Sequence, residues 1–306
     1  MKTISLNKHN KHTALITIHN PQKQNAFDAA LLTELAGKLK TVEDSRTYRV
    51  LYITGEGDKA FSTGVFLKDL IEFGSTSAAK RFAALLESTM DRLFNFPKPV
   101  IALINGYALG GGFGLAMSSD IRIMTADSKI GFPAVKIGAI LPSGCTYRLI
   151  SLVGAGHAKD LLLTGRHVPA DEALRIGMVN YVVRDKKALF QKADEVSELI
   201  LQGAPQALSM TKITVNKHTN ELISRYGLYS PDNLFNDSLL FRLDRLQDRI
   251  QRLVDRILDE SAGVYHNCFA LYVVPFDSVP GFFPMEKSID PFLPVICRGK
   301  ISKVVR

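Results

Sequence analysis

The chain has 306 residues, of which 46% are apolar and 22% charged, the composition of a globular protein with a buried core. Its net charge of +8 is scattered rather than gathered in a Lys/Arg block, which suits an anionic ligand and argues against RNA as the main partner. Cys145, Cys268 and Cys297 are too few and too far apart for a disulfide framework or a zinc site, and no apolar run has the length of a membrane span. We therefore expect a protein of a reducing compartment, the cytoplasm or an organelle matrix, that holds no metal and does not cross a membrane.

The first two thirds of the chain alternate short apolar runs with helical patterns. Apolar residues recur at every second position over 4–6 and again over 14–18, which predicts a hairpin that turns at 8–11. Asp28 is placed to cap a helix that follows it. Further strands are predicted at 50–54, 100–104, 121–125 and 179–183, with one helix over about 78–94 and another ending near 119. Strands that alternate with helices predict an α/β fold with parallel strands and right-handed crossovers.

The sequence changes in character after about residue 221. Apolar residues then recur at alternating spacings of four and three, at Leu239, Leu243, Leu246, Ile250, Leu253 and Ile257. This heptad spacing predicts an amphipathic helix over about 237–260, followed by a tail punctuated by prolines. We therefore divide the chain into a core over 1–220 and a C-terminal extension over 221–306.

Two segments that follow predicted strands carry the chemistry of the chain. Residues 59–65 read KAFSTGV, and residues 105–114 read NGYALGGGFG and open a predicted helix. Consecutive glycines let a backbone come close to a ligand, and unpaired amides at a helix N-terminus favour negative charge. The glycines alone would equally suit close packing of a helix on a strand, since they match neither the dinucleotide nor the P-loop motif.

Taken in order with FPKPVIALINGYALGGG, SDIRI and PAVKIG, these segments resemble the crotonase (enoyl-CoA hydratase/isomerase) superfamily over about residues 3–220. The resemblance implies a spiral of ββα turns that assembles as a trimer or a dimer of trimers. It also implies an acyl-CoA thioester as ligand, with coenzyme A bound as part of the substrate and no separate cofactor. The chemistry shared by this family is an oxyanion hole of two backbone N–H groups that stabilises a thioester enolate. By position, these donors are the amides of Val65 and Gly111.

The same resemblance implies further contacts with the CoA portion of the ligand. The positions that it assigns to CoA binding are Lys23, Gln24, Ser62, Thr63, Lys68 and Gly110. Of these, Lys23 and Lys68 would equally suit a solvated surface, where lysines are common.

The sequence departs from the family at two positions that matter for proton transfer. The hydratases carry glutamates where this chain has Gly114 and Ala134, and neither side chain here can accept or donate a proton. General acid–base groups contribute about 10²–10⁴-fold each, so ordinary hydration is disfavoured. The neighbouring Ser143, Cys145, Thr146 and Tyr147 supply no carboxylate or histidine as a replacement.

Two functional hypotheses follow for acyl-CoA and fatty acid metabolism. The first is a lyase- or isomerase-type enzyme that uses the oxyanion hole without the two glutamates, for example to decarboxylate a malonyl-type thioester. The second is a catalytically silent acyl-CoA-binding subunit, a pseudoenzyme. An RNA-binding role has only the net charge in its support.

Overall fold

The computed structural model describes residues 2–65, 76–137 and 140–226. The expected CoA contact Lys68, the heptad helix predicted over about 237–260 and the proline-punctuated tail lie outside these residues. The division of the chain at residue 220 therefore stays a prediction.

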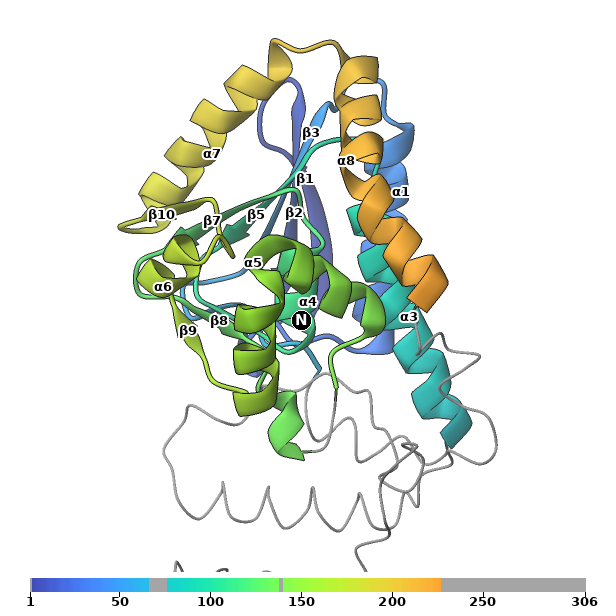
Figure 1. Ribbon diagram of the computed structural model, residues 1–306. Coiled ribbons are helices and arrows are strands. Elements are labelled where there is room, and N and C mark those ends of the chain that lie inside the picture. The colour runs from blue at the N-terminus through green and yellow to red at the C-terminus, as the bar shows by residue number, and fades with distance from the viewer. Residues whose placement is uncertain (1, 66–75, 138–139, 227–306) are drawn as a thin grey trace, which may run out of the picture.

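A six-stranded sheet in the order β1–β2–β3–β5–β7–β10 forms the centre of the molecule (Figure 1). Its strands are Thr3–Lys8, Thr13–His19, Val50–Gly55, Val100–Ile104, Ile121–Thr125 and Tyr181–Val183. All neighbouring strands are parallel except the antiparallel hairpin β1–β2. The central strands β3 and β5 are buried along their whole length, as expected for parallel strands covered on both faces.

A second sheet of four short strands has the order β4–β6–β8–β9. Its strands are Ala60–Ser62, Tyr107–Leu109, Lys129–Gly131 and Val168–Pro169. The sequence did not predict this sheet, because runs of two or three residues are too short to show a two-residue periodicity. Since β4 pairs in parallel with β6, the two segments that carry the family motifs lie side by side.

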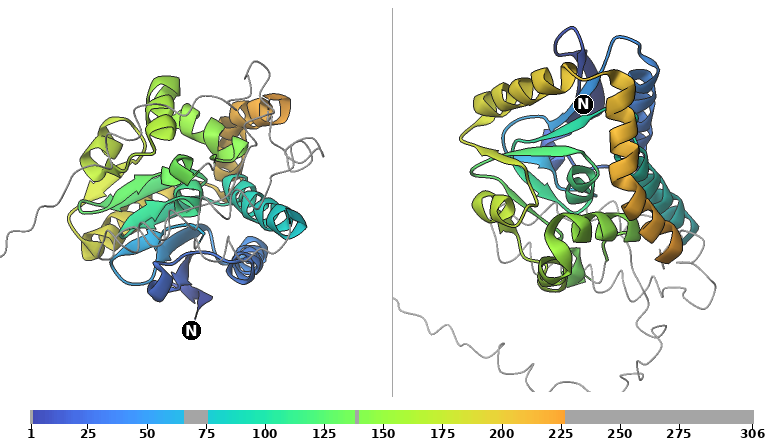
Figure 2. Two further views of the ribbon diagram at one scale, coloured as in Figure 1. Left: turned by 90° about the horizontal axis from the view of Figure 1, so that it is seen from below. Right: turned by 45° about the horizontal axis from the view of Figure 1, so that its top comes forward.

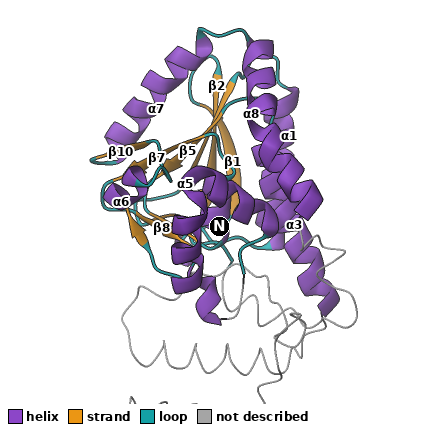
Figure 3. Ribbon diagram, in the orientation of Figure 1, coloured by secondary structure: helices purple, strands orange, loops and turns teal. Residues whose placement is uncertain are grey.

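Helices enclose the large sheet on both faces (Figures 2 and 3). They are α1 (Ala29–Asp44), α3 (Thr76–Phe94), α4 (Gly111–Met117), α5 (Ser143–Thr164), α6 (Ala170–Arg175), α7 (Lys186–Leu201) and α8 (Pro205–Tyr226), with 3-10 turns at Pro21–Lys23 and Pro133–Ile137. Helix α7 covers one face, where Leu189 and Val196 pack on Tyr52 and Ile101. Helices α1, α3, α4 and α5 contribute to the larger core on the other face.

Most of the predicted elements are confirmed. Asp28 caps α1, with its carboxylate accepting a hydrogen bond from the amide of Leu31 at 2.9 Å. The strand predicted at 179–183 is shorter than expected and begins at Tyr181, because the amide of Val179 is used in the turn that ends α6 and donates to Ala173 O. Helix α4 ends at Met117, two residues before the predicted end. Within the described ranges, no helix combines the length and apolar character that a membrane crossing requires.

Candidate active site

The backbones of the two motif segments touch each other, and glycine makes this approach possible. A Cβ atom added to Gly112 in α4 would lie 1.9 Å from the carbonyl oxygen of Ser62 in β4. A Cβ atom at Gly106, before β6, would lie 2.4 Å from the carbonyl carbon of Lys59. Contacts this short are impossible for any residue with a side chain, so the glycines that the sequence emphasised are required for packing between the segments.

A third close approach, at Gly64, lies beside the two expected oxyanion donors, the amides of Val65 and Gly111. Gly64 has a φ angle of +85°, and a Cβ atom there would lie 2.2 Å from the amide nitrogen of Gly111. The amide of Phe27 donates to Gly64 O at 2.5 Å, and the next amide, that of Val65, points the opposite way in a trans peptide. Gly111 is the first residue of α4, so its N–H has no acceptor within the helix.

Apolar side chains enclose these two amides. A Cβ atom at Gly111 would lie 3.6 Å from both Leu86 in α3 and Phe27, which are each 1% exposed. The side chain of Val65 is fully buried. Hydrogen-bond donors in such a water-poor setting interact more strongly with a developing negative charge than they would in water.

The expected CoA-binding positions that the structure describes gather beside this pair. Gln24 adopts a left-handed backbone conformation, with φ of 50°, and its carbonyl oxygen accepts from the amide of Thr63 at 3.2 Å. The hydroxyl of Ser62 donates to Asn25 O at 2.8 Å. Ser62 and Thr63 are fully buried. Lys23 is partly buried in the same turn, and Gly110 immediately precedes Gly111.

Asn25, the residue after Gln24, holds this turn in place. The side-chain amide of Asn25 donates to Glu56 O at 3.0 Å and to Ala60 O at 2.7 Å. Its side-chain oxygen accepts from the amide of Asn20 at 3.0 Å. Asn25 also has a positive φ of 57°, which asparagine tolerates better than most residues. An asparagine in a polar turn before a helix is the only sequence signal of this role.

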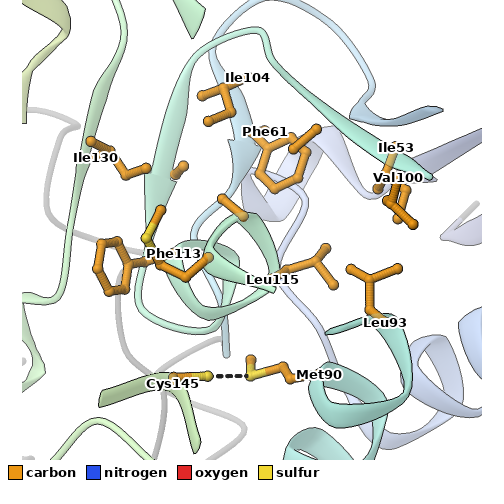
Figure 4. Close-up of a cluster of buried hydrophobic side chains, with 14 of the residues drawn as sticks. Ile53, Phe61, Met90, Leu93, Val100, Ile104, Phe113, Leu115, Ile130 and Cys145 are labelled. Atoms are coloured by element: carbon orange, nitrogen blue, oxygen red, sulfur yellow. Dashed lines mark hydrogen bonds between the residues drawn. The ribbon is translucent and has the colours of Figure 1, made fainter. Parts of the chain in front are cut away.

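Sulfur atoms fill the space beside Gly114. A Cβ atom there would lie 2.7 Å from Cε of Met90 and 3.2 Å from Sγ of Cys145, and these two side chains meet with 3.3 Å between their sulfur atoms (Figure 4). Ala134 is fully buried in the second 3-10 turn. Neither Gly114 nor Ala134 therefore places an ionisable group at the site.

A sequence profile described as "Enoyl-CoA hydratase/isomerase" matches residues 8–238. The chain belongs to the enoyl-CoA hydratase/isomerase family. It is 37% identical over 217 residues to the short-chain-enoyl-CoA hydratase of Clostridium acetobutylicum, covering 71% of this chain and 82% of that one. It is 37% identical over 227 residues to the crotonyl-CoA hydratase of Syntrophomonas wolfei, covering 73% and 85%.

Solved structures agree with this assignment. The structure of an enoyl-CoA hydratase from Bacillus anthracis matches with a TM-score of 0.66 and 30% identity, over 84% of this chain and 92% of that one. The mixed α/β fold with parallel sheets is thus the fold of this family.

Cys145 and Thr146, two of the residues that the sequence places near the site, have contacts within the fold. Burial raises the pKa of the Cys145 thiol to about 11, against the opposing effect of Arg148, so the thiol stays protonated and is a poor nucleophile. Thr146 uses its hydroxyl to bond Leu141 O at 3.2 Å. Ser143 is buried at the start of α5.

A charged residue in α3 was also missed. Glu87 is only 8% exposed, and it lies beside Leu86 and Met90, which belong to the buried apolar face of the helix. Glutamate is rarely buried to this degree. The available sequence signal was an acidic residue inside the apolar stripe Phe82, Ala83, Leu86, Met90 and Leu93. Within the described ranges, no three His, Cys, Asp or Glu side chains cluster in a way that could hold a metal ion.

Proposed function

We propose that this protein binds an acyl-CoA thioester with its carbonyl oxygen between the amides of Val65 and Gly111 and stabilises the enolate. The proposal depends chiefly on the contact of Gly64, the residue before Val65, with the first amide of α4. One backbone donor of this kind is worth about 2.7–4 kcal/mol in comparable oxyanion holes. Relatives named as hydratases of short-chain enoyl-CoA and of crotonyl-CoA support the same ligand class.

The CoA moiety would lie along the turn that contains Lys23 and Gln24, against the peptide groups of Ser62, Thr63 and Gly110. The positive net charge of +8 suits the phosphates of such a ligand. Lys68 would add a charge from outside the described residues. Coenzyme A would enter as part of the substrate, so the protein needs no further cofactor.

The reaction that we propose does not use the two glutamates of the hydratases. Gly114 and Ala134 cannot position water, and Met90 and Cys145 make the surroundings apolar. A carboxylate on the α-carbon would lose its hydration there, whereas loss of CO₂ gives the enolate directly and needs no base. Decarboxylation of a malonyl-type thioester is therefore the first reaction to test.

A silent acyl-CoA-binding subunit is the second candidate, because both positions that carry glutamate in the hydratases lack an ionisable group. Both candidates fit a trimer or dimer of trimers in the cytoplasm or an organelle matrix. Exposed apolar side chains on α8, among them Met210, Ile213 and Val215, are available for contacts between subunits. Light scattering of the full chain would measure the assembly.

Mass spectrometry of a thioester panel decides between the two candidates. Malonyl-, methylmalonyl-, 2-enoyl-, 3-enoyl- and 3-hydroxyacyl-CoA would each be incubated with and without the full-length protein, and CoA binding would be measured calorimetrically on the same sample. Conversion of one thioester identifies the reaction and eliminates the silent subunit. Binding without conversion supports the silent subunit, and absence of binding refutes both candidates.

A further inference from the structure

We propose that Glu87 is the catalytic acid–base group of this site and supplies, from α3, the carboxylate that positions 114 and 134 lack. This inference rests on the proposed function, because it needs a thioester held at Val65 and Gly111. It extends that function by assigning the proton transfer at the α-carbon to a named residue.

The first argument is the course of α3 along α4. Leu86 lies against Gly111, because a Cβ atom added to Gly111 would be 3.6 Å from Cδ1 of Leu86. Met90 lies against Gly114, because a Cβ atom added to Gly114 would be 2.7 Å from Cε of Met90. The two helices therefore run side by side in the same direction, with residue 86 level with the oxyanion amide and residue 90 one turn further on. Glu87 lies between these two contacts along α3.

The second argument is the direction that Glu87 faces. Its neighbours on the helix surface, three and four residues on, are Met90 and Asp91. Met90 contacts Cys145, and Asp91 forms an ion pair with Arg148 of α5. Glu87 therefore faces the corner between α4 and α5. Long helical side chains lean toward the helix N-terminus, which brings its carboxylate back toward the level of Gly111.

The third argument is electrostatic and concerns the same corner. Burial is the main reason for the raised pKa of the Cys145 thiol, and the negative charges of Asp91 and Glu87 raise it further. The Glu87 carboxylate is thus close enough to act on Cys145, whose Sγ lies 3.2 Å from the Cβ position of Gly114. A carboxylate brought near residue 114 by a neighbouring helix can do the work of one attached there.

The chemistry is a reversible proton transfer. The Glu87 carboxylate takes a proton from the α-carbon of the thioester, and the C–H electron pair becomes the enolate double bond. The carbonyl π electrons move to the oxygen, where the amides of Val65 and Gly111 stabilise the charge. The carboxylic acid of Glu87 then returns a proton to the α-carbon. In a decarboxylation, the same acid would protonate the enolate left by CO₂.

Exchange of the α-protons of butyryl-CoA in D₂O tests this step whatever the net reaction is. Mass spectrometry would follow deuterium incorporation with the full-length protein, and calorimetry would measure butyryl-CoA binding. The wild type should catalyse exchange, and Glu87→Gln should lower its rate by about 10²–10⁴-fold while leaving the affinity unchanged. The matched control is Glu34→Gln in α1, a partly buried glutamate that bonds Thr3 and Ile4 of β1, and it should exchange at the wild-type rate.

The outcomes separate this inference from the function on which it rests. Absence of butyryl-CoA binding to the wild type refutes the proposed function itself. Binding without exchange, or exchange at an equal rate in Glu87→Gln, refutes only the role of Glu87. If Glu87→Gln does not fold, Glu87→Asp replaces it, because withdrawing the carboxylate by one methylene should lower the exchange rate and leave binding intact. A wild-type rate in Glu87→Asp would refute the assignment.

Discussion

Met90 occupies the space into which a side chain at Gly114 would extend, with 2.7 Å between its Cε and the Cβ position of residue 114. The absence of a side chain at position 114 and the long side chain of Met90 on α3 are therefore complementary. Cys145 completes the contact from α5, at 3.3 Å between the two sulfur atoms. Thioether and thiol groups thus fill the space beside residue 114.

Giving this protein hydratase activity should therefore require a change at Met90 as well as glutamates at positions 114 and 134. We expect Gly114→Glu/Ala134→Glu to hydrate crotonyl-CoA no faster than the wild type, because Met90 obstructs the new carboxylate. Adding Met90→Ala should raise the rate at least about 100-fold above that of the double variant. The measurement is the loss of absorbance of the enoyl thioester.

The control for this experiment is the stability of each variant. Inserting Gly114→Glu beside an intact Met90 overpacks the core and should cost about 1–3 kcal/mol in urea unfolding, a cost that Met90→Ala should partly remove. Equal hydration rates in the double and triple variants would show that Met90 moves aside freely and does not obstruct residue 114.

Gly64 should be indispensable for the oxyanion hole. Gly64→Ala would place Cβ 2.2 Å from the amide of Gly111 in a backbone with φ of +85°, so the two donors must separate. We expect a loss of about 10²–10³-fold in conversion or in α-proton exchange, the usual effect of losing one donor.

Gly57→Ala is the matched control for Gly64→Ala. Gly57 has a similar φ of +76° but nothing within 4 Å of its Cβ position. Both variants bear the cost of the left-handed backbone, about 1–2 kcal/mol, but only Gly64→Ala disturbs the amide pair. If both lose activity equally, the effect comes from backbone strain and not from the oxyanion hole.

The regular elements of the large sheet could be predicted from the sequence, and the short strands could not. The run at 100–104 is uniformly apolar because β5 is buried on both faces, so burial is visible in composition alone. β4 and β6 have three residues each, and their pairing depends on Gly106 and Gly112, which sequence patterns mark only as turn residues. The family resemblance, rather than periodicity, indicated that these segments meet.

The sequence assigns the candidate site to backbone groups through the family resemblance, and this assignment stays a prediction. The family resemblance names the amides of Val65 and Gly111 as the donors, and the structure places Gly64, the residue before Val65, against the amide of Gly111. The contacts of Asn25 and the burial of Glu87 depend on which helices and turns happen to face each other. A single sequence does not contain that information, because a glutamate within an apolar stripe can also turn to solvent.

Asn25 should affect ligand binding more than catalysis. Asn25→Ala removes the two donors that bond Glu56 O and Ala60 O, and it should destabilise the fold by about 1–3 kcal/mol. The turn that carries Gln24 would loosen, so we expect weaker CoA binding by calorimetry with little change in the rate at saturating substrate.

The control for Asn25→Ala is Asn7→Ala in β1, an exposed residue whose side-chain amide donates to the hydroxyl of Ser5 at 3.2 Å. It should leave both stability and CoA affinity close to those of the wild type. A lower saturated rate with unchanged affinity in Asn25→Ala would instead show that the turn acts on the reacting groups.

Cys145 should be inert in the folded protein. With its pKa raised to about 11 by burial, only about one thiol in a thousand is ionised at pH 8, and the thiolate is the reactive form. We expect iodoacetamide to leave the Cys145 peptide unlabelled at pH 8 and to label it after unfolding in urea. Peptide mass spectrometry distinguishes this site from Cys268 and Cys297.

The raised pKa of Cys145 should also affect the stability of the fold at alkaline pH. The folded-state pKa of Cys145 exceeds the ordinary value of 9.0, so the folded protein holds this proton more tightly than the unfolded chain. The stabilisation is complete below pH 9 and is lost as the pH rises toward 11. Cys145→Ala should therefore lose less stability than the wild type between these pH values in urea unfolding. Rapid labelling of native Cys145 at pH 8 would contradict both expectations and would make this thiol a candidate nucleophile beside Gly114.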